Sequence, residues 1–157
     1  WLAIPQSGGS TVTTDNGGDA WVIPTGIEGL EHPHGNAQIF QDAASIFVAG
    51  IGGPQSGMYR STDWGESFTH VQGGNLGIAW GTENAVYTMW GWACAGCDLG
   101  ASFQHSPLSG DDWTAEAVPK EMNIGANHIA VTSDGTHNIF VGTMWSTGVW
   151  RYIEPTG

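Results

Sequence analysis

The sequence predicts an all-β protein built from small antiparallel sheets. Gly, Pro, Ser, Thr, Asn and Asp interrupt the 157-residue chain so often that no helix-length stretch keeps the apolar period of an amphipathic helix. Short runs rich in β-branched and aromatic residues lie between these turn formers, as at residues 45–48 and 138–141. The pattern also recurs along the chain, which is typical of repeat architectures.

An internal repeat orders the predicted strands. Residues 36–74 and 75–119 align with each other, and residues 127–155 repeat the first three quarters of the same pattern. In the clearest copy the four predicted strands span residues 36–41, 44–50, 57–61 and 68–72. Across the copies, residues 45–48 (SIFV) match 138–141 (NIFV), residues 88–90 match 143–145, and residues 58–60 (MYR) match 149–151 (VWR). A unit of about 45 residues with four strands has the size of one β-propeller blade.

A turn motif accompanies the repeat. Residues 61–68, Ser-Thr-Asp-Trp-Gly-Glu-Ser-Phe, stand between the third and fourth predicted strands. They resemble the Asp-box, S-x-D-x-G-x-T-W, of BNR-repeat β-propellers such as sialidases, xyloglucanases and sortilin-type receptors. Residues 13–18 followed by Trp21 resemble a second copy with one extra residue, and residues 109–113 resemble a decayed third. The resemblance implies a fold rather than a reaction.

The Asp-box resemblance implies a structural role for seven residues. In such a turn the carboxylate accepts backbone N–H groups, the glycine takes a positive φ, and the closing aromatic packs between sheets. The residues concerned are Asp15, Gly17 and Trp21 in one copy, and Ser61, Asp63, Gly65 and Phe68 in the other.

The two ends of the chain carry incomplete units. Residues 1–26 supply three strands of a blade without its first, and residues 127–157 supply three without a fourth. A closed ring of about six to eight blades needs a longer chain. We therefore expect a partial propeller of about three to four blades, completed by a second chain or by another copy of this one.

Composition narrows the class of partner. The chain has 3 Lys and Arg residues against 15 Asp and Glu residues, a formal net charge of −12 at pH 7. Such a chain repels nucleic-acid phosphates and anionic lipid, so we expect neither nucleic acid nor membrane as a partner. Nine Trp residues and 40% hydrophobic residues predict a folded chain, and its length fits one domain or part of one.

The first residue and the two cysteines indicate the cellular compartment in which the protein is expected. The chain begins at Trp1 with no Met, basic stretch or apolar leader, so we expect a processed product or an excerpt. Cys94 and Cys97 form one Cys-x-x-Cys pair, and a zinc site would need histidines such as His32 or His34 to complete it. We instead expect a local disulfide in a secreted, extracellular protein, with no metal and no cofactor.

Propeller geometry brings two sets of loops to one face. This face, here called the mouth face, holds the connections from fourth to first strands and from second to third strands. Its aromatic, imidazole, amide and carboxylate side chains suit a neutral or weakly charged glycan or polysaccharide. The expected ligand contacts are Trp90, Trp92, Trp145, His34, Asn127 and His128. Trp90 and Trp145 occupy equivalent repeat positions, so packing between blades is an equal reading for them.

The sequence leaves open whether the protein is an enzyme. A glycoside hydrolase needs two carboxylates across the sugar and a polysaccharide lyase needs a base, and no spacing in the sequence singles out a pair. The candidate catalytic residues are Glu31, His34, Asp98, Glu121 and His128. The arginine triad of sialidases is absent, because the chain holds only Arg60 and Arg151, at matching structural positions.

Three hypotheses follow. The first is a secreted glycan-recognising propeller that uses the mouth face. The second is a carbohydrate-active enzyme, a glycoside hydrolase or a polysaccharide lyase, whose site is shared with a missing half. The third is a structural or protein-binding propeller.

Overall fold

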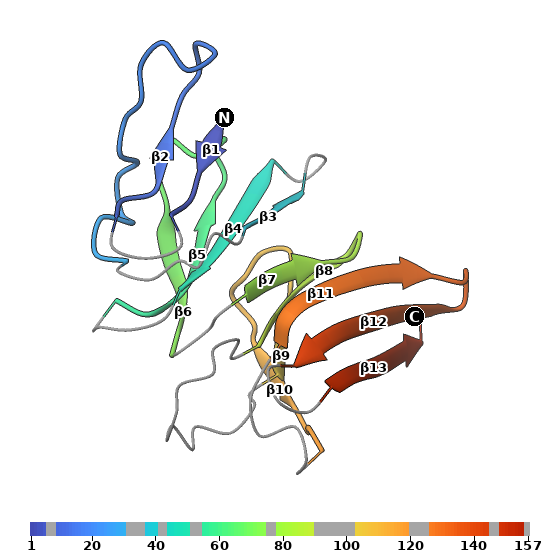
Figure 1. The fold of residues 1–157 in the computed structure, drawn as a ribbon. Coiled ribbons are helices and arrows are strands. Elements are labelled where there is room, and N and C mark those ends of the chain that lie inside the picture. The colour runs from blue at the N-terminus through green and yellow to red at the C-terminus, as the bar shows by residue number, and fades with distance from the viewer. Residues whose placement is uncertain are drawn as a thin grey trace.

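The protein is all-β, as the sequence predicts. A computed structural model describes residues 1–5, 9–30, 37–40, 44–50, 55–74, 78–89, 103–119, 126–144 and 148–155. These residues form thirteen strands in four small antiparallel sheets and no helix (Figure 1). Nothing in them therefore has the helical length and apolarity that crossing a bilayer requires. The architecture is consistent with blade-like pieces of a β-propeller.

Each sheet is a meander in which strands adjacent in sequence pair with each other. The first sheet holds β1 (Leu2–Ala3) and β2 (Val12–Thr13), and Val22 bridges to Thr13. The second sheet holds β3 (Ala37–Phe40), β4 (Ser45–Gly50), β5 (Gly57–Ser61) and β6 (Thr69–Gly73). The third holds β7 (Ile78–Gly81), β8 (Ala85–Met89), β9 (Phe103–Pro107) and β10 (Thr114–Glu116). The fourth holds β11 (Ala126–Ser133), β12 (His137–Met144) and β13 (Gly148–Pro155).

Three hydrophobic clusters lie between successive sheets. The cluster between the first and second sheets contains Ile27, Leu30, Ile46, Val48, Tyr59 and Phe68. The cluster between the second and third contains Phe40, Phe47, Ala49, Met58 and Val86. The cluster between the third and fourth contains Tyr87, Met89, Phe103 and Phe140. Alternate residues of β4 enter different clusters, because successive side chains of a strand point to opposite faces.

The second, third and fourth sheets approach one another most closely at their first strands. Strand β7 contacts β3 and β4 of the preceding sheet and β11 of the following sheet. No comparable packing joins the last strands β6, β10 and β13 in the described part of the chain. The sheets therefore diverge from their first strands outward, as blades do, and follow one another in sequence order (Figure 1).

The ladder in the fourth sheet corrects one repeat match by a residue. Phe47 of β4 lies opposite Arg60, whereas Val141 of β12 lies opposite Arg151. If the two arginines are equivalent, Phe47 corresponds to Val141 and not to Phe140. Phe140, in the fourth sheet, accordingly packs against the preceding third sheet. Phe47, in the second sheet, packs against the following third sheet. The similarity of SIFV and NIFV favours an alignment that differs from the ladder by one residue. A shift of one residue moves every side chain of the strand to the other face of the sheet.

Candidate functional site

Most of the predicted mouth-face residues lie outside the described residues. These are Glu31, His34, Trp90, Trp92, Cys94, Cys97, Asp98, Glu121 and Trp145. Asn127 and His128 lie in β11 rather than in the connection before it, and the ladder is irregular between Ala126 and His128. The disulfide, the catalytic candidates and the aromatic contacts thus stay predictions.

A large cleft lies on the opposite side, between the third and fourth sheets. Its volume is about 790 Å³. It lies where the β7–β8, β9–β10 and β11–β12 turns emerge, on what we call the turn face. The polar side chains that line this polar cleft are Thr82, Glu83, Asn84, Tyr87, His105, Asp112, Thr114, Thr132, Ser133, Asn138 and Glu154.

A tyrosine and a glutamate join the two walls of the polar cleft. Tyr87 of β8 is 2% exposed, and its hydroxyl donates a hydrogen bond to Oε2 of Glu154 on β13. Nδ2 of Asn138 lies 3.5 Å from the same oxygen. Burial raises the pKa of Tyr87 above its ordinary value, and the hydrogen bond to Glu154 and the charge of Glu154 raise it further. Tyr87 therefore remains a protonated donor at neutral pH and is a poor nucleophile.

A second polar pair lies on the third sheet beside Tyr87. Nδ1 of His105 on β9 lies 3.3 Å from Oε1 of Glu116 on β10. The His105 ring lies 5.6 Å from the Tyr87 ring, centroid to centroid. The carboxylate on one side and the aromatic ring on the other limit the orientations of the imidazole. His105 thus presents its ring to the polar cleft from a strand, which is a more rigid support than a loop.

The charge of the polar cleft has one sign. Glu83, Asp112 and Glu154 contribute carboxylates, and no Lys or Arg is among the described residues that line the cleft. Carboxylates accept hydrogen bonds, while the amides of Asn84 and Asn138 both donate and accept. The lining therefore favours a neutral or cationic ligand with many hydroxyl or amine groups and disfavours a sulfate, phosphate or uronate.

The turn at residues 61–68 is closed by its own side chains. Oγ of Ser61 donates to Oδ1 of Asp63 at 2.8 Å and accepts the Gly65 N–H at 2.8 Å. Asp63 in turn accepts the backbone N–H of Ser67 at 3.0 Å and the Ser67 hydroxyl. These two bonds from Ser67 lower the pKa of Asp63 to about 2. Gly65 takes a φ of 93°, and Phe68 is buried between the first two sheets.

The turn after β2 has the same bonds except the one from the Ser67 hydroxyl, and they are shifted by one residue from the sequence alignment. Oγ1 of Thr14 donates to Oδ1 of Asn16 at 2.7 Å and accepts the Gly18 N–H at 3.1 Å. Oδ1 of Asn16 also accepts the N–H of Ala20 at 3.1 Å. Asn16 and Gly18 therefore occupy the positions of Asp63 and Gly65, with no extra residue. The positions assigned to Asp15 and Gly17 were displaced because the carboxylate, rather than the spacing, guided the alignment.

The other turns keep only part of this pattern. Oγ of Ser109 donates to Oδ1 of Asp111, but Trp113 stands where the glycine would be. Its indole Nε1 donates instead to the carbonyl oxygen of Gly110 at 2.8 Å. Trp21, which would be the closing aromatic of the first turn, is 43% exposed.

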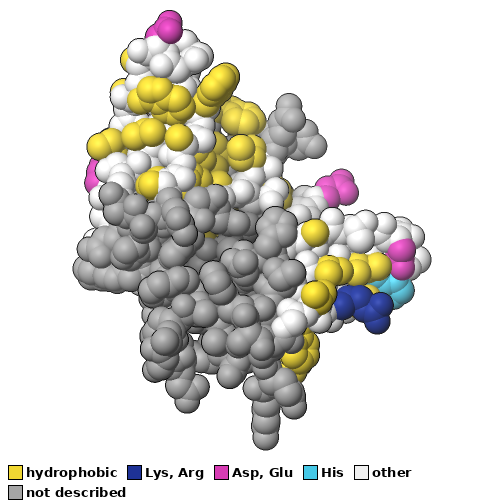
Figure 2. All heavy atoms as spheres, viewed as in Figure 1, with side chains coloured by type: hydrophobic (Ala, Val, Ile, Leu, Met, Phe, Trp, Pro, Cys, Tyr) yellow, Lys and Arg dark blue, Asp and Glu magenta, His cyan; other side chains and the backbone are white. Residues whose placement is uncertain are grey.

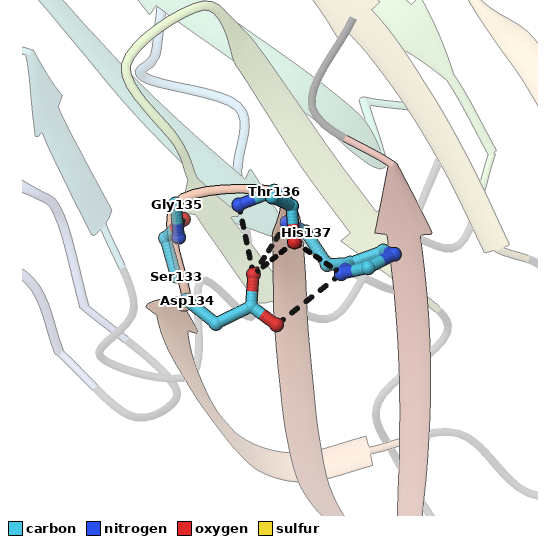
Figure 3. A network of polar contacts seen from close by, with 5 residues as sticks. All are labelled: Ser133, Asp134, Gly135, Thr136 and His137. Atoms are coloured by element: carbon cyan, nitrogen blue, oxygen red, sulfur yellow. Dashed lines mark hydrogen bonds and ion pairs between the residues drawn. The ribbon is translucent and has the colours of Figure 1, made fainter.

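The β11–β12 turn holds a polar network that the sequence reasoning missed (Figure 3). Oδ1 of Asp134 accepts the N–H of Thr136 at 2.8 Å and the N–H of His137 at 2.7 Å. Its Oδ2 lies 3.2 Å from Nδ1 of His137. Hydrogen bonds from Thr136 and His137 hold the pKa of Asp134 well below its usual range. The Asp-Gly pair between two apolar runs was the available sign of a tight turn.

Comparison with known proteins assigns no family to the chain. No protein-family model and no curated protein matches the chain. Within the described ranges, no group of three or more His, Cys, Asp or Glu side chains is placed to hold a metal ion.

Proposed function

We propose that this protein is a partial BNR-type β-propeller that recognises a glycan in the polar cleft. The observation that carries the proposal is the cleft itself, a space of about 790 Å³ lined by carboxylates, amides, hydroxyls and an imidazole at the ends of strands. Ligand sites generally occupy about 300–1,000 Å³ and place a few polar groups on a rigid frame.

The side-chain chemistry matches a polyhydroxylated ligand. Glu83 and Asp112 are exposed carboxylates that accept hydrogen bonds from sugar hydroxyls. Asn84 donates and accepts, so it can pair with adjacent hydroxyls. With no described cation in the lining, a neutral or amino sugar fits better than an acidic one.

Binding is favoured over bond cleavage. Tyr87 has a raised pKa and donates to Glu154, so this pair orients groups rather than attacking a substrate. The Asp-box family assignment is supported by the shared hydrogen-bond pattern of the turns at Thr14 and Ser61. The secreted location belongs to the same proposal, and the mouth-face contacts define the alternative glycan site.

An array of neutral, amino and acidic oligosaccharides, followed by calorimetry, tests this function. We expect a neutral or amino glycan to bind and Glu83→Gln combined with Asn84→Ala to weaken it at least about tenfold, the effect of losing about 1.4 kcal/mol. Glu28→Gln, a matched change at an exposed carboxylate outside the cleft, should leave the affinity unchanged.

The outcomes separate the hypotheses. A bound glycan whose affinity is insensitive to the cleft variant would move the site away from the cleft, toward the mouth face. New reducing ends or unsaturated uronates after incubation would replace recognition by catalysis. An empty array would overturn the glycan proposal.

A further inference from the structure

A second groove lies on the turn face, between the turns of the first two sheets. It has a volume of about 360 Å³ and is lined by Thr13, Thr14, Asp15, Ala20, Val22, Asp63, Trp64, Gly65 and Glu66. We call it the Trp64 groove. It shares no lining residue with the polar cleft, which lies between the third and fourth sheets.

Backbone hydrogen bonds join the segment after the first turn to the turn of the second sheet. The N–H of Phe68 donates to the carbonyl oxygen of Thr25 at 2.8 Å, and the N–H of Thr25 donates to that of Glu66 at 3.3 Å. A Cβ at Gly65 would meet Cγ2 of Thr13 at 3.1 Å, so the turn at Gly65 lies close against β2. The walls of the groove are thus set before any ligand arrives, which lowers the entropy cost of binding.

An indole is held open at the rim of the groove. Trp64 is 56% exposed and has a φ of 60°, a left-handed conformation that a bulky residue rarely adopts. The hydrogen bonds among Ser61, Asp63 and Ser67 fix the turn on both sides of it. Its side chain is therefore displayed to solvent beside the groove instead of packing in the core.

The polar atoms around the indole are mainly acceptors. Asp15, Asp63 and Glu66 contribute carboxylates, and no Lys, Arg, His, Asn or Gln is among the described lining residues. The low pKa of Asp63 keeps its charge at all but the most acidic pH. An aromatic face bordered by carboxylates complements a guanidinium group, which stacks on indole and pairs with carboxylates.

The chain has few cations of its own to fill this groove. It contains 3 Lys and Arg residues in all. Arg60 donates to Ser45 and to the carbonyl oxygen of Ser109, between the second and third sheets, and Arg151 lies in β13 of the fourth sheet. Lys120 lies outside the described residues. No Lys or Arg is among the described residues that line the groove, so a partner molecule can supply the complementary charge.

We propose that the Trp64 groove binds an arginine side chain of an extended basic segment in a partner protein. The indole stacks on the guanidinium, while Asp15 and Glu66 accept its hydrogen bonds from the two turns. This would be a protein-docking site separate from the glycan site, and it does not depend on glycan recognition.

The test uses the peptide acetyl-Gly-Arg-Gly-Arg-Gly-amide and the same peptide with citrulline in place of arginine. We expect the arginine peptide to quench tryptophan fluorescence and to bind at least about fivefold tighter than its citrulline counterpart. Trp64→Ala should lose most of this binding without changing the net charge. Trp21→Ala is the matched control, because Trp21 is also exposed but does not line the groove.

Diffuse attraction to an acidic protein predicts a different result. In that case Trp64→Ala would bind the arginine peptide as the parent protein does, and the proposal would be overturned. Equal binding of the citrulline peptide, or binding of a neutral oligosaccharide that Trp64→Ala abolishes, would overturn it as well. Glycan binding in the polar cleft should persist in Trp64→Ala, so the two proposals fail independently.

Discussion

The second and fourth sheets have similar strands but opposite surroundings. All six residues of β4 are buried, because the first and third sheets cover its two faces. The fourth sheet packs one face on the third sheet and exposes the other, where Val141, Val149 and Ile153 are 40%, 71% and 44% exposed. Hydrophobic side chains over this sheet are visible in Figure 2, as they are over the first sheet. A strand of this kind therefore gains most of its stability from its neighbours on both sides.

The two arginines express the same difference. Arg60 donates to Oγ of Ser45 at 3.0 Å and to the Ser109 carbonyl oxygen at 2.9 Å, so it links the second sheet to the turn of the third. Its guanidinium carbon also lies 5.9 Å from the Phe47 ring centroid. Arg151 has the same place in the ladder, but it is exposed on the uncovered face. Whether an arginine at this ladder position links two sheets therefore depends on whether a following sheet covers its face.

The largest effect on the free energy of unfolding should come from Phe47, which is buried between the second and third sheets. Phe47→Ala removes a fully buried ring between the second and third sheets and should lower the free energy of unfolding by about 3–5 kcal/mol. Val141→Ala, at the corresponding ladder position, should change it by less than about 0.5 kcal/mol. Urea unfolding of both variants measures the difference. Similar losses for the two would show that the outer face of the fourth sheet is covered in solution.

The arginines should differ in the same direction and by less. Arg60→Ala removes hydrogen bonds to Ser45 and Ser109, so we expect a loss of about 1.5–3 kcal/mol in the free energy of unfolding. Arg151→Ala should be neutral within about 0.5 kcal/mol. Thermal unfolding at one ionic strength checks both values. A costly Arg151→Ala would contradict the assignment of this residue to a free face.

A smaller loss should follow when the link between the third and fourth sheets is cut. Tyr87→Phe removes the hydroxyl that donates to Glu154 and keeps the buried ring, so we expect about 1 kcal/mol of destabilisation. Burial raises the pKa of all three tyrosines, Tyr59, Tyr87 and Tyr152, and the rise is largest for Tyr87, so Tyr87→Phe should remove the tyrosine that ionises at the highest pH. Absorbance at alkaline pH reports this titration, and an unchanged curve would argue against the buried pair.

The smallest effect concerns pH and the two related turns. The pKa of Asp63 is lowered to about 2 in the folded protein and is near 3.9 when unfolded. Its stabilising contribution is therefore complete above about pH 4 and is lost as the pH falls toward 2. Asp63→Asn should remove this acid sensitivity and lose the same contribution at pH 7, while the turn still forms, since an amide at Asn16 accepts the matching backbone N–H in the first turn. Acid titration monitored by circular dichroism would disprove this if both proteins lost the same stability.

Sequence reasoning predicted the strands well because their causes are local. The predicted strands at residues 44–50 and 57–61 differ by at most one residue from β4 and β5. Turn formers bound these runs, and β-branched and aromatic side chains fill them. The turn around Asp63 was also located, since its residues bond within a few positions of one another.

The polar cleft could not be predicted in this way, because it depends on contacts between residues that are far apart in the sequence. Tyr87 and Glu154 meet although 67 positions separate them, and nothing in the spacing of either residue marks the pair. The alignment of residues 45–48 with 138–141 is one residue out of step with the strand ladder, because matching letters do not report which side of a ladder a side chain takes. The predicted mouth-face contacts remain predictions.

The amino-acid sequence determined that this chain forms short antiparallel strands closed by polar turns, because these choices depend on backbone preferences and neighbouring residues. Tertiary structure decided which strand faces are covered and where the polar cleft and the Trp64 groove lie. Both hollows form between elements distant in sequence, so their positions follow from how whole sheets pack. That packing is set by the summed burial of many side chains rather than by any one motif.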